Sequence, residues 1–176
     1  MRHLLTALAI ASAMLGQAEA ASLNIVALGA SNTYGMGRGA YMGGVQPARA
    51  WPAQLQALLK ARGINASVRN AGVPGDTTGG MLARLNAAVP NGTQLVILET
   101  GSNDARRGLA GETAGNIAAI TSQLAARNIK VIVVGRTRLL VPVESRDPDG
   151  QHFDARGHAV VAAHLLPQVL SAIGGQ

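Results

Sequence analysis

Five residues in four separate segments carry the groups that acyl transfer requires. Ser31 offers a hydroxyl at the end of an apolar segment, and the N–H groups of a helix that starts at such a turn favour developing negative charge. Gly75 offers a backbone N–H without a side chain, and Asn103 offers an amide donor. Asp149 and His152, three residues apart, supply an orienting carboxylate and a base. These residue types together indicate attack by a serine on an acyl carbonyl.

Other residues compete for two of these roles. Ser102 also follows a glycine after an apolar segment and is a rival nucleophile, although its neighbour Asn103 is better explained as an oxyanion donor. His158 competes as the base because Asp154 lies four residues before it, and the simpler interpretation is a surface pair at the start of a helix. His164, further along the same segment, is interpreted as structural.

The elements that must position these residues alternate along the chain. Strands are predicted over residues 22–28, 66–70, 94–99 and 130–134. Helices are predicted over residues 51–62, over a segment that Thr77 or Thr78 can cap and that ends before Pro90, over 112–127 and over 155–173. Pro167 is expected to kink or divide the last. Asp76 and Asp104 are predicted to cap the helices that follow them. The order predicts an α/β fold, a flavodoxin-like three-layer sandwich with a parallel sheet of about four strands and helices on both faces. In such folds ligands bind at the carboxyl ends of the strands.

The segments also resemble a known family when they are taken in order. They read GASN at 29–32, NAGVPGDTT at 70–78, GSND at 101–104 and DGQH at 149–152. This series resembles the sequence blocks of the SGNH (GDSL-like) hydrolases, nearest to the branch of bacterial lysophospholipase, thioesterase and arylesterase enzymes. The resemblance covers essentially the whole chain after residue 20.

The resemblance implies a Ser-His-Asp triad that cleaves carboxylic esters through an acyl-enzyme. Ser31 would be the nucleophile, His152 the base and Asp149 the residue that holds the tautomer of His152. The oxyanion donors would be the Ser31 N–H, the Gly75 N–H and the side-chain amide of Asn103. The substrate would be a small-molecule ester or a lipid, and no metal or organic cofactor is expected.

Two features depart from the family pattern. Ala30 stands where the family has the aspartate of Gly-Asp-Ser, which mainly organises the turn of the nucleophile, so we expect altered activity rather than none. Asn32 could replace part of its hydrogen bonding. Residues 135–148 are too few for the additional helix and strand that family members usually carry before Asp149. This shortened C-terminal half predicts a more open acyl pocket.

The first twenty residues are typical of an export signal. A short basic start precedes an apolar run over residues 4–15, and Ala18-Glu19-Ala20 has the small-x-small pattern of a cleavage site. We therefore expect a signal peptide over 1–20, a hydrolase domain over 21–176, and a periplasmic or secreted protein without stable membrane insertion after cleavage. A membrane anchor is the alternative, which the shortness of the run disfavours.

Composition excludes other classes of protein. The chain has no cysteine, which rules out thiol catalysis and cysteine-bound metal. Its net charge is +6, but the basic residues are scattered and aromatic residues are only 2%, so we expect no nucleic-acid partner.

Two alternatives to an esterase come from other classes. The first is a catalytically weak SGNH-like binding protein of the envelope, which the presence of all five site residues disfavours. The second is a nucleotide-binding flavodoxin-like domain, but Ser31, Asn32 and Thr33 supply only part of a phosphate-binding loop. The glycine-rich segment over residues 35–45 is interpreted as a loop that lines the substrate pocket or covers it.

Overall fold

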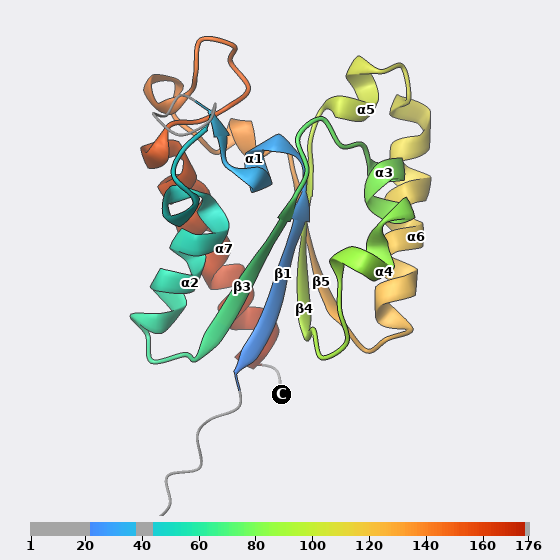
Figure 1. Cartoon of the computed structure of the whole chain (residues 1–176), viewed down its shortest axis with the longest axis vertical. Coiled ribbons are helices and arrows are strands. Elements are labelled where there is room, and N and C mark those ends of the chain that lie inside the picture. The colour runs from blue at the N-terminus through green and yellow to red at the C-terminus, as the bar shows by residue number, and fades with distance from the viewer. Residues whose placement is uncertain (1–21, 38–43, 175–176) are drawn as a thin grey trace, which may run out of the picture.

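The structure is a computed structural model that describes residues 22–37 and 44–174. The predicted signal peptide over residues 1–20 and the middle of the glycine-rich segment over residues 35–45 lie outside these residues. Four parallel strands form one sheet in the order β3-β1-β4-β5. One group of helices covers each face of the sheet, as Figure 1 shows, so the predicted three-layer α/β sandwich is confirmed.

The observed elements lie close to the predicted ones. The strands are β1 (Leu23–Gly29), β3 (Ala66–Gly72), β4 (Leu95–Thr100) and β5 (Lys130–Gly135). The helices are α1 (Ser31–Tyr34), α2 (Trp51–Lys60), α3 (Thr78–Ala83), α4 (Leu85–Ala88), α5 (Asn103–Arg106), α6 (Thr113–Ala125) and α7 (Ala155–Gly174). Short 3-10 turns are η1 (Pro47–Arg49), η2 (Ala110–Glu112), η3 (Thr137–Leu139) and η4 (Val143–Ser145).

Alternate residues of the central strands face two separate hydrophobic cores. In β1, Ile25 and Ala27 pack in the core under α2 and α7, whereas Val26 and Leu28 pack in the core under α3, α4 and α6. Trp51, fully buried, is the largest side chain of the first core. All residues of β4 are buried, as expected for a strand covered on both faces.

Two helices differ from the sequence prediction. The segment before Pro90 forms two short helices rather than one, because the backbone leaves helical geometry at Arg84 (φ −100°, ψ 10°). The last helix is continuous through Pro167, so the predicted division is not found. Both Pro167 and Ala163, whose carbonyl loses its helical donor, are exposed, so water can satisfy that carbonyl. α7 is long and apolar enough to cross a membrane, with a mean hydropathy of 1.3, but its buried side packs against α2.

The histidines of α7 contradict the sequence interpretation. His158 is completely buried instead of lying in a surface pair, and its ring packs edge-on against Phe153. Neither ring nitrogen completes a hydrogen bond among the described residues. Burial lowers the pKa of His158 from 6.5 to about 4, although the backbone of Met36 and the charge of Asp154 oppose the shift. His164, interpreted as structural, is exposed.

The buried His158 predicts a pH-dependent stability. Between pH 6.5 and pH 4 the unfolded state binds more protons at this residue than the folded state does. The contribution of neutral His158 to the free energy of unfolding is therefore complete above pH 6.5 and is lost as the pH falls through pH 4. This loss amounts to about 3 kcal/mol. In urea unfolding at these two pH values, His158→Leu should be less pH-dependent than the wild type. His164→Leu, at an exposed position, is the control and should keep the wild-type dependence; equal dependence in all three proteins would contradict the prediction.

Candidate active site

A pocket lies where the carboxyl ends of the strands meet the loops. Its empty volume is about 420 Å³, including space open to solvent. Three of the five predicted site residues line it: Ser31, Asn103 and His152. Gly75 and Asp149 do not line the pocket, but each bonds to residues of the same end of the sheet. The sequence segments that were predicted to meet at this edge therefore do meet there.

Ser31 is the first residue of α1 and lies two residues after Gly29, the last residue of β1. The carbonyl of Ala30, just before α1, accepts the N–H of Tyr34 (3.0 Å), and the carbonyl of Ser31 accepts the N–H of Gly35 (3.1 Å), which closes one helical turn. Within the described residues the Ser31 hydroxyl makes no hydrogen bond, and no direct bond joins it to His152. The half-buried hydroxyl is thus available on the pocket wall.

Two glycines allow this turn to pack closely. A Cβ atom at Gly29 would lie 2.1 Å from Oγ1 of Thr33, and one at Gly72 would lie 2.2 Å from the backbone nitrogen of Tyr34. Real Cβ atoms do not approach other atoms so closely, so both positions require glycine while the backbone keeps this path. The end of β3 therefore packs directly against the backbone of α1, which restricts the position of Ser31.

His152 is oriented by Asp149 on the loop before α7. Nδ1 of His152 lies 2.5 Å from Oδ2 of Asp149. Oδ1 of the same carboxylate accepts the backbone N–H groups of Gln151 (2.8 Å) and His152 (3.0 Å). Partial burial raises the pKa of Asp149, but these N–H groups and the His152 ring outweigh it and lower the pKa to about 2. The carboxylate is therefore ionised and favours a proton on Nδ1, which leaves Nε2 as the basic nitrogen.

The loop that carries His152 is anchored in the core although the segment before it is short. Phe153, next to His152, is completely buried, and the backbone of Arg146 forms a bridge with it. A Cβ atom at Gly157 would lie 2.8 Å from both Phe153 and Ser145, so α7 packs tightly on this loop. These contacts hold the loop against the first core.

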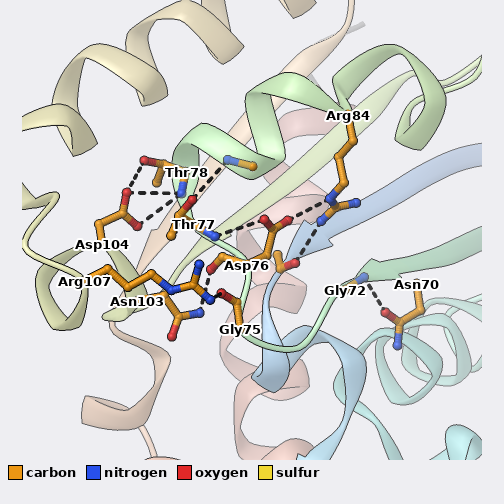
Figure 2. Close-up of polar contacts among 12 residues, drawn as sticks. Asn70, Gly72, Gly75, Asp76, Thr77, Thr78, Arg84, Asn103, Asp104 and Arg107 are labelled. Atoms are coloured by element: carbon orange, nitrogen blue, oxygen red, sulfur yellow. Dashed lines mark hydrogen bonds and ion pairs between the residues drawn. The ribbon is translucent and has the colours of Figure 1, made fainter.

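Asn103 is fixed from two sides. Its side chain is 5% exposed, and its Nδ2 donates to the carbonyl of Asp76 at 2.6 Å. Its Oδ1 accepts a hydrogen bond from the guanidinium group of Arg106. Gly75 has φ +77°, and its carbonyl accepts a hydrogen bond from the guanidinium group of Arg107 at 2.7 Å, as Figure 2 shows. The chain after β3 and the chain after β4 are therefore joined at the site.

Asp76 and Asp104 have other partners than predicted. Thr77 caps α3, since its hydroxyl accepts the N–H of Gly80; this confirms one of the two threonines predicted as the cap, whereas the cap predicted at Asp76 is not found. Asp76 instead pairs with Arg84 at 2.7 Å (Figure 2). Arg84 also donates to the carbonyl of Gly29 at 3.1 Å. The break between α3 and α4 occurs at Arg84, the residue that makes this link.

Asp104 caps a helix from another part of the chain. Its carboxylate accepts the Thr78 hydroxyl at 2.5 Å and the Thr78 N–H at 3.1 Å, so it caps α3 rather than the helix that follows it. Asn116 on α6 donates to the Thr78 hydroxyl at 3.1 Å. This buried cluster connects three segments of the structure.

Glu99, which the sequence interpretation did not select, also lines the pocket. It is 1% exposed and accepts the hydroxyls of Thr33 (3.2 Å) and Thr137 (3.1 Å). Burial raises the pKa of Glu99, and the hydrogen bonds from Thr137, Thr33 and the backbone of Ala30 oppose that rise. A carboxylate inside an otherwise apolar strand was the signal that could have identified it, because such a group needs partners.

Of the two residues that compete for roles in the site, Ser102 lies at the pocket and His158 does not. Ser102 lines the same pocket, and its Oγ lies 3.5 Å from Oε1 of Gln151. His158 does not line the pocket and faces Phe153 within the core. Within residues 22–37 and 44–174, no three His, Asp or Glu side chains gather in a way that could hold a metal ion.

A serine, an asparagine and a carboxylate-bound histidine at the strand ends of a parallel α/β sheet are typical of a serine hydrolase. The chain belongs to the GDSL-like lipase/acylhydrolase family, whose model matches residues 27–166. This confirms the resemblance and the predicted enzyme class, a hydrolase of ester bonds.

Individual relatives agree with this assignment. The chain is 31% identical to esterase TesA of Pseudomonas aeruginosa over 99% of this chain and 84% of that protein. The solved structure of AlinE4, an SGNH-hydrolase family esterase, is 30% identical, with a TM-score of 0.55 over 84% of this chain and 72% of that one. Esterase EstA from Pseudoalteromonas sp. matches with a TM-score of 0.73 over 86% of this chain and 98% of that one. At 18% identity, that match shows the fold alone.

The cluster around Thr78 predicts a specific loss of stability. Thr78→Val removes the hydroxyl and leaves the Asp104 carboxylate and the Asn116 amide with one partner fewer, which should lower the free energy of unfolding by about 1–3 kcal/mol. Thr78→Ser keeps the hydroxyl and is the matched control. Denaturant unfolding of the three proteins measures the difference. A valine variant as stable as the serine variant would show that the hydroxyl does not stabilise the fold.

Proposed function

We propose that this protein is a serine esterase in which Ser31 is the nucleophile, His152 the base and Asp149 the residue that orients the base. The observation that carries the proposal is the shared pocket: Ser31, Asn103 and His152 line it together, and Asp149 holds Nδ1 of His152. The rival base His158 is buried away from the pocket, which supports His152.

The reaction follows from these positions. Oγ of Ser31 attacks the ester carbonyl carbon while Nε2 of His152 takes the hydroxyl proton, and the carbonyl electron pair moves onto its oxygen. His152 then gives the proton to the leaving alcohol as the carbon–oxygen bond breaks. Water, deprotonated by His152, attacks the acyl-enzyme; the bond between the acyl carbon and Oγ breaks, and His152 returns the proton to Oγ of Ser31 as the carboxylic acid is released. His152 must come within hydrogen-bond distance of Ser31 when the substrate binds, because such bonds often tighten only in the complex.

The oxyanion donors in this proposal are the N–H groups of Ser31 and Gly75 and the amide of Asn103. One hydrogen of Asn103 Nδ2 is used by the carbonyl of Asp76, and the second is left for the oxyanion. Arg106 holds the other end of the amide, so the group cannot rotate freely. A donor fixed before the reaction stabilises developing charge without a cost of reorganisation.

The substrate class in this proposal is carboxylic esters. The curated relative of Pseudomonas aeruginosa is named an esterase, and a shorter match from Vibrio mimicus is named an arylesterase. Thioesters and lysophospholipids are further substrates of the same chemistry that we propose to test. A binding protein without activity would not need an oriented base and a fixed amide beside the same serine.

Replacement of the nucleophile is the direct test. We expect Ser31→Ala to abolish hydrolysis of p-nitrophenyl esters, from acetate to long-chain acyl, because no other group in the triad can form the acyl-enzyme. Ser102→Ala, at the neighbouring serine of the same pocket, is the matched control and should remain active. Equal activity of the wild type and Ser31→Ala would overturn the assignment, and loss of activity only in Ser102→Ala would transfer it to that residue.

Removal of the amide donor tests the oxyanion site. Asn103→Ala should lower kcat by about 100- to 1,000-fold, the usual effect of losing one oxyanion donor. Because Asn103 also bonds to Asp76 and Arg106, thermal unfolding of the variant must be measured beside its kinetics. A folded variant with nearly unchanged kcat would exclude Asn103 from the oxyanion site.

We propose in addition that residues 1–20 direct export and are then removed. The basic start, the apolar run and the Ala18-Glu19-Ala20 pattern support this, and all lie outside the described residues. The protein expressed in a bacterial host should appear in the periplasm or medium with Ala21 as its first residue by N-terminal sequencing. A protein retained in the cytoplasm and still beginning at Met1 would contradict export.

A further inference from the structure

Three arginines line the pocket together with the site residues. They are Arg106, Arg136 and Arg138, and all are exposed to solvent. The ion pairs found among the described residues are Arg84–Asp76 and His152–Asp149, so none of the three pocket arginines is paired with a carboxylate there. Their guanidinium groups are charged at every physiological pH. The pocket rim therefore has positive charge that the described residues do not neutralise.

The arginines come from segments that follow two adjacent strands. Arg106 lies on α5, after β4, and the other two lie around η3, after β5. β4 and β5 are paired neighbours, from Leu95 opposite Lys130 to Thr100 opposite Gly135. Because β4 and β5 lie on the same side of β1 in the sheet, both segments reach the pocket from that side of Ser31.

The segment that carries Arg136 and Arg138 is held in place from below. Thr137, between them, is 1% exposed, and its hydroxyl donates to Glu99 at 3.1 Å. The N–H of Arg136 donates to the carbonyl of Thr100 at 3.2 Å, and Arg136 has a left-handed backbone (φ 43°). Because Thr137 is buried and hydrogen-bonded, it fixes the backbone positions of Arg136 and Arg138 on either side of it. The charges are positioned by the fold and are not a random feature of a loose loop.

Neither acidic group at the site forms an ion pair with these arginines. Asp149 is paired with His152 and does not line the pocket. Glu99 lines it, but burial raises the pKa of its carboxyl and two threonine hydroxyls occupy its oxygens. An anion that enters the pocket therefore meets guanidinium donors, which bind carboxylates and phosphates through paired hydrogen bonds.

We propose that the site prefers ester substrates that carry an anionic group, a carboxylate or a phosphate, which Arg136 and Arg138 bind. The inference rests on the proposed esterase activity and narrows its substrate class. Arg106 contributes charge to the same pocket but is tied to Asn103, so its loss would also disturb the proposed oxyanion donor. The two arginines that flank Thr137 are therefore the ones to change.

Paired substrates test the preference. For an anion on the acyl side, the p-nitrophenyl monoester of adipate is compared with p-nitrophenyl hexanoate, whose chain has the same length and no charge. For an anion on the alcohol side, para-acetoxybenzoate is compared with phenyl acetate. In at least one pair we expect the wild type to favour the anionic ester in kcat/KM, and this preference should weaken as salt is added. The pair that shows it identifies the side of the ester that carries the anion.

Charge-matched variants separate the pocket from the overall charge. Arg136→Gln/Arg138→Gln should lower the ratio of anionic to neutral kcat/KM by about tenfold or more, because it removes charge-assisted hydrogen bonds. Arg62→Gln/Arg69→Gln removes the same charge at exposed residues that do not line the pocket, and should keep the wild-type ratio. An unchanged ratio in the Arg136/Arg138 variant, in both substrate pairs, would overturn the proposal while leaving esterase activity established.

Binding without turnover keeps the two proposals distinguishable. Monomethyl adipate is titrated calorimetrically into Ser31→Ala protein with and without the Arg136→Gln/Arg138→Gln changes. Weaker binding to the protein without the two arginines supports anion recognition even if no ester is hydrolysed. Equal binding, or none to either protein, counts against anion recognition whatever the esterase assay shows.

Discussion

The pairing of β1 with β4 at the centre of the sheet determines where the pocket forms. β4 is buried throughout and β1 is buried from Ile25 to Gly29, and their register places Ile25 opposite Leu95 and Leu28 opposite Leu98. A shift of one residue would exchange the side chains of the two cores, so burial fixes this register. Ser31 lies two residues beyond β1 and Asn103 three beyond β4. The positions of Ser31 and Asn103 relative to each other therefore depend on that alignment.

Buried polar groups turn this alignment into a rigid site. Glu99, Asn103 and Asp104 are 1%, 5% and 4% exposed, and each has hydrogen-bond partners from other segments. A buried group that loses its partner costs about 1–3 kcal/mol, so each bond also penalises movement of the segments that it joins. The same contacts that offset burial therefore hold the turn of Ser31, the chain after β3 and the segment of Thr137 in one arrangement.

The sequence was sufficient for the strands, the layers and the edge at which the site residues meet, because local apolar pattern and strand order determine these. It was insufficient where a distant partner decides the local structure. Arg84 interrupts the predicted helix where it reaches Asp76 and the carbonyl of Gly29, 55 residues away. Glu99 bonds to Thr33 across 66 residues, and His158 is buried by Phe153 and the surrounding core. No local pattern contains such contacts.

Neighbouring segments hold the turn of Ser31 although no acidic residue precedes this serine. Ala30 is buried and has no polar side chain. The carbonyl of Gly29 instead accepts the N–H of Val73 and the guanidinium of Arg84, each at 3.1 Å, while Thr33 bonds to Glu99. The turn is thus tied to the chain after β3, to α3 and to β4. With three independent attachments, its geometry does not depend on a carboxylate at position 30.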